Sequence, residues 1–386
     1  MISAESAIRD TRTLIGIDSQ NPGPLEGACA EWVGNRLSDL GLQPALQPVT
    51  AGRSNIVATV PGSGTAPRLV LLAHMDTVPV GHGWTFPPFG AMIADDRIYG
   101  RGACDMKAGL AVALNLLGWL AADQVQPAGD VVLIATVDEE GPDMSGAHAL
   151  ARSAILRPDD QILALEPTGL RLRIAQMGLR WVTITVSGRM AHAGRAHLGI
   201  DANHVLCRIV DSLKDAVDSL PYRDPVLGRA RMTCGTIVGG EAVNVVPPLA
   251  RAQIDLRLVP PMTPDSLMDL VRRRAADVIA AFPGASYELT PLGAERPPVR
   301  ADDDAPVVRA LRQAYQECTG AVLPSGGADG HEAYTDASMV AAVTGSTSAT
   351  VFGPGSTDDA HASDEFVTVA DIELMCRVMT QLVRSW

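Results

Sequence analysis

The sequence predicts an α/β protein in which helices flank a mostly parallel sheet, with a smaller α+β domain inserted into the chain. Three short apolar runs in the first half, at 69–73, 131–137 and 162–165, have the length of strands. Each run leads directly into an acidic residue or a histidine. Buried strands of parallel sheets are apolar throughout, and ligands bind just beyond their carboxyl ends. These runs therefore predict a sheet with a functional site at the carboxyl ends of its strands.

Helical segments alternate with these strands, which is typical of a parallel sheet. Apolar residues at helical spacing, bounded by turns rich in Gly and Pro, indicate where the helices lie. One segment, 106–122, is apolar nearly all round, so we expect it to be buried against the sheet. The other helices predicted in this half are 3–17, 26–40 and 145–153, and strands at 55–60 and 68–73 precede the long apolar helix.

The pattern changes after Glu166. Strands with alternating polar and apolar residues are predicted at 181–186 and 251–258, with helices at 201–219 and 263–282 and a turn-rich stretch around 235–248. Such strands form an open sheet with one polar face. We place this inserted lid or dimerisation domain at 177–290. The catalytic domain then comprises 1–176 and 291–386, with late helices at 303–319, 335–343 and 370–385 and a strand at 349–352.

Composition excludes several classes of function. The chain has 386 residues and a formal net charge of −13, which argues against a nucleic-acid-binding or anionic-membrane-binding surface. We find no apolar stretch of about twenty residues and no signal peptide at the N-terminus, so a cytoplasmic location is expected. The six cysteines contain no Cys-x-x-Cys pair, which argues against a zinc–thiolate site. Phosphate-binding glycine loops of nucleotide-binding proteins are also missing from the sequence.

Five residues near the predicted strand ends have side chains that bind metals, namely His74, Asp105, Glu140, Glu166 and His361. Catalytic zinc prefers imidazole and carboxylate ligands and keeps one position open for water. Five ligands are too many for one such ion, but they fit two ions that share a carboxylate, and Asp105 is the natural bridge. Two neighbouring metals can deprotonate a water and polarise a carbonyl.

Two further acids have no predicted metal. Asp76 follows His74 by two residues, so its side chain could orient the imidazole by a hydrogen bond. Glu139 is free to take a proton from water and pass it to a leaving amine. Each residue alone has an ordinary explanation, because acids after strands are often helix caps and a lone histidine often lies in the core. Their joint arrangement favours a catalytic site.

Several segments closely resemble the zinc-dependent family of acetylornithine deacetylase, succinyl-diaminopimelate desuccinylase, aminoacylase and glutamate carboxypeptidase. The resemblance covers essentially the whole chain, with its motifs in the expected order. The segments that carry it are Leu72–Pro79, Tyr99–Gly109, Asp138–Gly141, Glu166–Thr168, Gly188–Gly194, Gly239–Pro247 and Gly353–Gly355, followed by His361.

The resemblance implies the same five ligands, with Glu139 as general base, Asp76 as the residue that orients His74, and a cis peptide bond after Asp105. It also implies that His192 stabilises the oxyanion, often from the partner subunit of a homodimer that forms through the inserted domain. One preorganised donor of this kind is worth about 3–4 kcal/mol. The substrate contacts implied are Asn244 and Arg257, which would hold a substrate carboxylate, with Thr335 and Gly355 lining the pocket.

These observations predict a two-zinc amidohydrolase, with Co2+ or Mn2+ as substitutes, that cleaves the amide of an N-acyl amino acid. A metal-dependent exopeptidase is the alternative within enzymes, and sequence does not separate the two. A non-catalytic metal-binding protein is disfavoured because all ligands and Glu139 are present. The chain departs from the family at His331, Glu332 and Tyr334, where relatives have a small residue before the Thr-Asp pair, which leaves the acyl and amino-acid specificity open.

Overall fold

The computed structural model describes residues 1–23, 25–122, 126–324 and 333–386, and these fall into two compact units. Unit 1 contains Met1–Ala175 and most of the chain after Arg300. Unit 2 contains Gln176–Val299 and a short segment that ends at Tyr334. The inserted unit therefore extends beyond the predicted boundary at 290, because a strand from Ser286 to Arg296 completes its sheet.

A six-stranded sheet forms the centre of unit 1, in the order β1-β2-β6-β3-β7-β18. Strands β6, β3, β7 and β18 are parallel to one another, whereas β2 is antiparallel to β6, and β1 is antiparallel to β2. The predicted mostly parallel α/β fold is confirmed. The strands are β1 Ala45–Thr50, β2 Arg53–Val60, β3 Leu69–His74, β6 Val131–Thr136, β7 Gln161–Ala164 and β18 Thr350–Val351.

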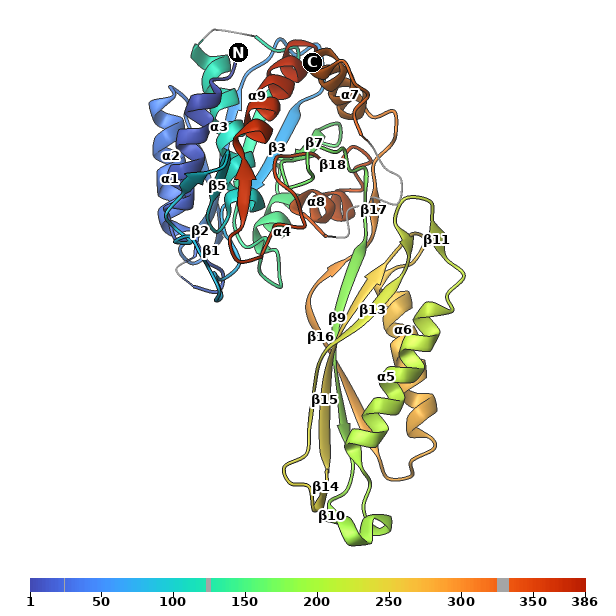
Figure 1. The fold of residues 1–386 in the computed structure, drawn as a ribbon. Helices are drawn as coiled ribbons and strands as arrows, with labels where there is room; N and C mark the ends of the chain where they lie inside the picture. Colours follow the sequence, from blue (N-terminus) through green and yellow to red (C-terminus); the bar gives the residue numbers. More distant parts are fainter. Residues whose placement is uncertain (24, 123–125, 325–332) are drawn as a thin grey trace. The chain divides into compact units, whose positions relative to one another are not determined.

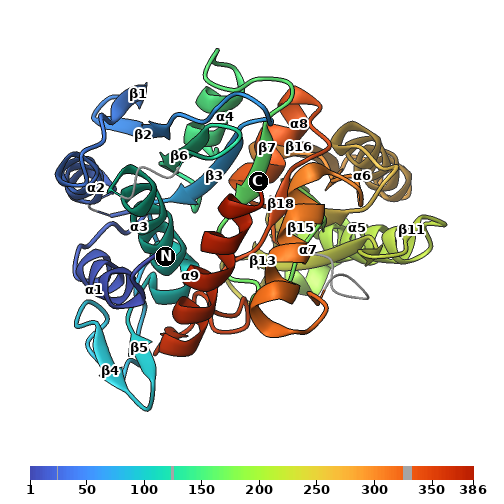
Figure 2. The same cartoon turned by 90° about the horizontal axis from the view of Figure 1, so that it is seen from above.

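Helices cover both faces of this sheet (Figure 2). The helices form two groups. The first group packs around α3, and the second consists of α4 and α8, which pack against each other. The first group is α1 Ala4–Ile15, α2 Gly27–Asp39, α3 Ala108–Ala122, α7 Pro306–Thr319 and α9 Val369–Arg384, and the second is α4 Ser145–Ala151 and α8 Asp336–Thr344. A small antiparallel sheet lies beside them, formed by β4 Met92–Ala94, β5 Arg97–Tyr99 and β19 Phe366–Thr368.

The central helix α3 is buried along nearly its whole length, as its composition predicts. Among the described residues, one helical stretch, Ala103–Ala122, is long and apolar enough to cross a membrane by length and composition alone. The stretch contains Asp105 and Lys107, so it is not an uninterrupted run of apolar residues. Its apolar window is 94% buried inside the structure, as in the core helix of a globular domain.

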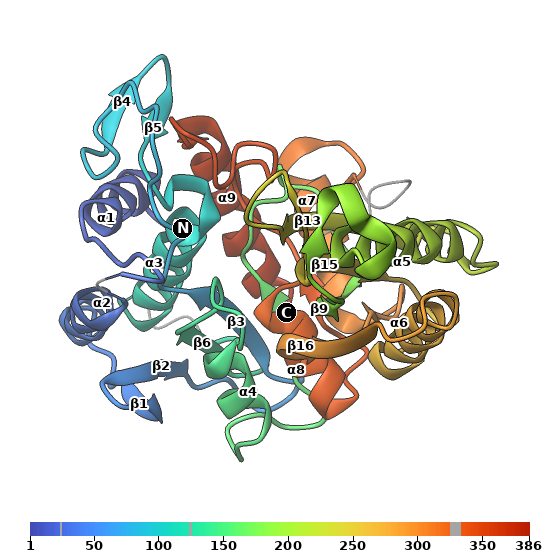
Figure 3. The same cartoon turned by 90° about the horizontal axis from the view of Figure 1, so that it is seen from below.

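Unit 2 has a four-stranded antiparallel sheet in the order β13-β15-β9-β16, with α5 and α6 packed together along it (Figures 1 and 3). The elements are β9 Gly178–Ser187, α5 Ala202–Asp218, β13 Arg231–Gly239, β15 Leu249–Leu258, α6 Pro264–Ile279 and β16 Ser286–Arg296. Strand β13 occupies part of the stretch predicted as turns. Short strand pairs complete the chain, namely β10 Ala191–His192 with β14 Val245–Val246, β11 Arg223–Asp224 with β12 Gly228–Arg229, and β8 Ala175–Gln176 with β17 Val299–Arg300.

Gly109 allows α3 to approach the end of β7, and we predict that Gly109→Ala destabilises the protein. An added Cβ would lie 2.3 Å from the backbone oxygen of Leu165, and overpacking of this kind costs about 1–3 kcal/mol. Gly118→Ala in the same helix is the matched control, because the three atoms nearest to its Cβ belong to the flexible end of the half-buried Leu40 side chain. Thermal unfolding followed by circular dichroism should show a lower Tm for Gly109→Ala but not for Gly118→Ala. Equal Tm values for the two variants would contradict this account.

Candidate metal centre

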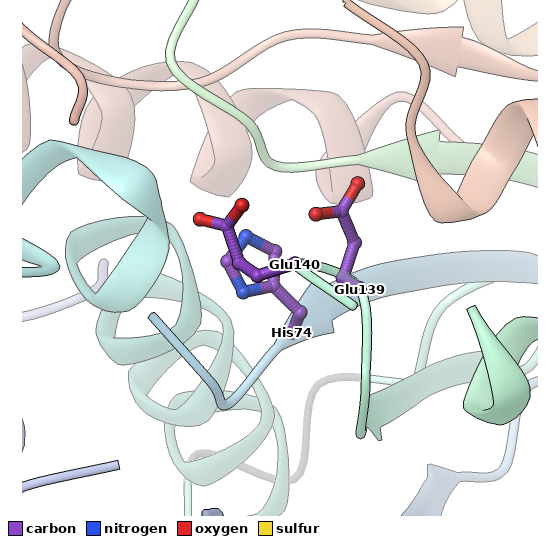
Figure 4. A group of neighbouring side chains, drawn as sticks. All are labelled: His74, Glu139 and Glu140. Carbon is purple, nitrogen blue, oxygen red and sulfur yellow. The ribbon is translucent and has the colours of Figure 1, made fainter. Parts of the chain in front are cut away.

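Strands β6, β3 and β7 of unit 1 are parallel, so their carboxyl ends lie side by side. His74 is the last residue of β3 and pairs with Thr136, the last residue of β6. Glu139 and Glu140 follow in the loop after β6, and Glu166 lies two residues beyond β7. Figure 4 shows the two glutamates of the loop beside the imidazole of His74. The register of the sheet therefore brings together acids that are far apart in the sequence.

Asp105 lies between the two histidines. Its Oδ1 is 3.1 Å from Nε2 of His74, and its Oδ2 is 3.2 Å from Nε2 of His361. Glu166 Oε2 is 3.6 Å from His74 Nε2, and Glu140 Oε1 is 3.0 Å from His361 Nε2. The five predicted ligands thus form two sets of three, with Asp105 in both. Within each set the candidate ligand atoms are within 4.8 Å of one another.

Glu139 belongs to a third group, with His74 and Glu140, whose polar atoms also lie within 4.8 Å of one another. Burial raises the pKa of the Glu139 carboxyl well above its usual range, and the nearby charge of Glu166 adds to this effect. A carboxyl with a raised pKa can accept a proton near neutral pH and release it again. The position of Glu139 is therefore suited to proton transfer.

The site concentrates negative charge. Burial, together with the nearby Asp105, raises the pKa of Glu166 to about 8. Hydrogen bonds to Asp105 and Glu140 raise the pKa of His361 to about 10. In spite of burial, the two imidazoles hold the pKa of Asp105 below its usual range. Carboxylates crowded in this way attract positive charge, as a bound divalent cation supplies.

The tautomer of His74 supports metal binding. Its Nδ1 is 2.9 Å from the backbone oxygen of Asp76, and a carbonyl oxygen only accepts hydrogen bonds, so Nδ1 carries the proton. In the neutral ring Nε2 then presents a lone pair toward Asp105 and Glu166. A lone pair beside two carboxylates suits a cation that all three share. Imidazole and carboxylate donors also match the preferences of zinc.

The role expected for the side chain of Asp76 needs correction. The nearest acceptor for His74 Nδ1 is the Asp76 backbone, because the carboxylate oxygen is 3.6 Å away. That carboxylate instead accepts hydrogen bonds from the backbone N–H groups of Glu139 and Glu140, each at 3.2 Å. Asp76 therefore fixes the loop that carries the predicted base, while its backbone orients the imidazole.

Sequence reasoning missed two residues that hold the centre. Asn21 donates to Asp76 Oδ2 and to Asp138 Oδ1, both at 2.9 Å, and so ties the loop after β6 to the loop after β3. Glu365 accepts from the backbone N–H groups of Cys104 and Asp105. Neither residue stands in a local pattern that predicts these contacts, because each partner is distant in the sequence.

The neighbourhood of Asp105 is tightly packed. The peptide bond from Asp105 to Met106 is cis, as the resemblance implies. Gly355 has φ 79°, and a Cβ at this position would lie 2.4 Å from the Cβ of Cys104. Thr335 is buried at the N-cap of α8. The substrate contacts predicted for Gly355 and Thr335 stay predictions.

In unit 2, His192 and Asn244 lie close together. His192 pairs with Val245 across β10 and β14, and the Asn244 carbonyl accepts from the N–H of Ala193 at 3.0 Å. The ring of His192 is exposed, and its Nδ1 accepts from the N–H of Gly194. A cavity of about 530 Å3 lies at this end of the unit, lined by residues of 193–203 and 239–247.

Arg257 lies elsewhere in unit 2. It occupies the end of β15 that pairs with Leu179, whereas Leu249, at the end near Asn244, pairs with Ser187. Eight residues of strand separate the two ends by roughly 26 Å. Asn244 and Arg257 therefore do not meet within a single chain, and the carboxylate contact expected of both stays a prediction. The guanidinium of Arg257 also forms a bidentate pair with Asp255, at 2.8 and 2.9 Å.

Of the residues that depart from the family pattern, Tyr334 is buried, and its ring lies 6.0 Å from the guanidinium carbon of Arg296. His331 and Glu332 lie outside the described residues. The influence of these positions on specificity therefore stays a prediction.

Comparison with curated proteins shows relatives over nearly the whole chain. The sequence is 31% identical over 366 residues to an acetylornithine deacetylase of Proteus mirabilis, covering 93% of this chain and 90% of the relative. It is 28% identical over 406 residues to a probable succinyl-diaminopimelate desuccinylase of Staphylococcus epidermidis, covering 95% and 94%. Both names describe hydrolysis of an acyl group from an amino acid.

Solved structures share the fold. A metallo-carboxypeptidase of Sulfolobus solfataricus superposes with a TM-score of 0.82 at 19% identity, covering 98% of both chains. The Bacillus subtilis protein YxeP, described as a dinuclear metal-binding peptidase, has a TM-score of 0.73 at 16% identity, covering 98% of this chain and 97% of its own. Residues 70–385 match the model of peptidase family M20/M25/M40. The chain therefore belongs to this family, and it is a metallohydrolase that acts on amide bonds.

Proposed function

We propose that this enzyme removes the acyl group from an N-acyl amino acid and that two divalent cations serve the reaction. The observation that carries the proposal is the position of Asp105, whose two carboxylate oxygens each face one imidazole. His74 and Glu166 complete one donor set, and Glu140 and His361 complete the other. The deacetylase and desuccinylase relatives support this substrate class over an exopeptidase substrate.

When bound, the cations would polarise the amide carbonyl and make an attacking water more acidic. The residues of the chain supply the remaining steps. Glu139 accepts the proton of the attacking water and delivers it to the nitrogen of the leaving amine. Asp76 holds the Glu139 backbone in place for both transfers. Zn2+ is the cation we propose, and Co2+ or Mn2+ can replace it because imidazole and carboxylate accept several metals.

His192 and Asn244 are proposed to contact the substrate from a second subunit. The chain enters unit 2 at β8 and then runs along the ten-residue strand β9. His192 and Asn244 lie beyond the far end of β9, so they are remote from the point of entry. The strand alone spans roughly 30 Å. A symmetric dimer allows such distant residues to complete the site of the partner chain.

Exposed apolar side chains support unit 2 as the dimer interface. Strand β13 lies at an edge of the sheet, and its Ile237 and Val238 are 52% and 72% exposed. Val243 and Leu249 are also exposed at the same end of the unit. An exposed apolar edge strand favours pairing with another strand, and a second copy of this chain provides an identical one. Arg257 is also proposed to contact the substrate.

The first prediction from the proposed function concerns metal binding. Zn2+ should raise the Tm of the metal-free protein, because a ligand that binds only the folded state adds about 4 kcal/mol at 1,000 times its Kd. Asp105→Ala removes the shared carboxylate and should abolish most of this rise. Thermal unfolding with and without Zn2+, combined with elemental analysis, measures both effects. A wild-type Tm that responds neither to Zn2+ nor to a chelator would rule out the metal centre.

The second prediction separates catalysis from metal binding. Glu139→Ala should keep both ions and lower kcat by roughly 10²- to 10⁴-fold, the range of general acid–base catalysis. Glu140→Ala is the matched comparison, because it should lose metal as well as activity. Turnover of N-acetyl amino acids, N-succinyl amino acids and dipeptides is measured for each variant. Retained activity in Glu139→Ala would contradict its role, and wild-type preference for dipeptides would favour the exopeptidase.

The third prediction tests whether His192 acts across a dimer. His192→Ala and Glu139→Ala chains should each be inactive alone. Coexpressed with two affinity tags and purified as heterodimers, they should recover about half of the wild-type activity, because one of the two sites then has both residues intact. Heterodimers whose chains both carry Glu139→Ala are the control. An inactive mixed heterodimer would show that His192 serves its own chain.

A further inference from the structure

A buried ion pair joins the two chain segments that carry Asp105 and His361. Arg101 Nη1 bonds to Glu365 Oε2, and the two residues are 2% and 1% exposed. Arg101 precedes Asp105 by four residues, and Glu365 follows His361 by four. The pair touches no predicted ligand side chain, so the catalytic roles proposed above do not explain it.

The glutamate of this pair holds the backbone at Asp105. Glu365 Oε1 accepts from the N–H groups of Cys104 and Asp105, both at 3.1 Å. Its own carbonyl accepts from the N–H of Gly100 at 2.9 Å. Hydrogen bonds to a charged acceptor are stronger than neutral ones. The carboxylate therefore fixes the position from which the Asp105 side chain reaches between the two imidazoles.

The arginine holds the backbone at His361. Arg101 Nη2 donates to the carbonyl of His361 and to that of Pro79, both at 3.3 Å. The side chain of His361 is 50% exposed, and the residue has φ 63°, a conformation that is uncommon outside glycine. Surrounding side chains thus restrain His361 less than they restrain the buried His74. The contact from Arg101 supplies a restraint that packing does not.

The other donor set depends less on this pair. His74 is the last residue of β3, in the middle of the sheet, and Glu166 follows the neighbouring strand β7. Backbone hydrogen bonds of the sheet therefore position His74 and the strand that leads to Glu166. Only Asp105 is common to the two sets.

We propose that the Arg101–Glu365 ion pair is a positioning pair for one of the two cations, the one held by Asp105, Glu140 and His361. This inference rests on the proposed di-metal function. Its consequence is an asymmetry between the two metal sites, because the pair orients two of the three ligands of this site but one ligand of the other. Residues that orient metal ligands typically change metal affinity by about 10–100-fold.

The test uses a double variant, Arg101→Met with Glu365→Met, so that no charge is left buried without a partner. The control is Arg68→Met with Asp160→Leu. That pair is largely buried and bidentate, at 2.7 and 2.6 Å, but its residues precede β3 and β7, and Arg68 is roughly 20 Å of strand away from His74. Circular dichroism melts of the metal-free proteins check that each variant folds. His361→Ala serves as the reference for loss of one ion.

Elemental analysis after dialysis counts the Zn2+ ions per chain, and competition with a chromophoric chelator measures their affinities. Wild-type protein and the Arg68/Asp160 control should hold two ions. The Arg101/Glu365 variant should hold one ion with near-normal affinity, as His361→Ala does, and bind the other at least tenfold more weakly. Arg101→Lys keeps the charge but loses the planar fork, and it should also weaken one ion. If the double variant does not fold, Arg101→Lys decides the question.

Two results would overturn the inference alone, namely two ions of unchanged affinity in the Arg101/Glu365 variant or equal weakening of both. Wild-type protein that binds no divalent ion would instead overturn the proposed function, together with the inference that rests on it. The two failures are therefore distinguishable in the same experiment.

Discussion

The carboxylate of Asp105 lies between two imidazoles, and the remaining residues of the centre are arranged around it. Each oxygen faces a different histidine, so the position of this one side chain determines whether two donor sets exist. Its backbone is held by Glu365 on one side and by the buried start of α3 on the other. The catalytic arrangement therefore depends on where the chain places a single aspartate.

Concentrating so many acids at one edge of a sheet opposes folding, because each buried charge repels its neighbours. Charged and polar groups behind the ligands offset part of this cost. Asn21 and Arg53 donate to Asp138, and Glu26 accepts from the backbone of the same residue. Hydrogen bonds to charged groups contribute about 1.5–3 kcal/mol each. This network holds the loop of the base in one conformation, which proton transfer requires.

Much of unit 1 could be predicted because its signals are local. Apolar runs and helical spacing identified the middle strands and α3, and the five candidate ligands were identified from their positions near strand ends. The strands β13 and β16 were missed because most of their residues are exposed or only partly buried, and because each contains Gly or Pro residues, which are typical of turns. The separation of Asn244 from Arg257 was not foreseen for another reason: residue type indicates chemistry but not which end of a strand a residue occupies.

The sequence by itself determined the fold class, the family and the kinds of side chain at the centre, because periodicity and short motifs are properties of neighbouring residues. The tertiary structure decided which atoms meet. Glu365 contacts the backbone of Asp105 from 260 positions away, and the Asp76 carboxylate bonds to the base loop rather than to the imidazole. Such contacts arise from the order and register of the strands, which depend on packing between distant segments.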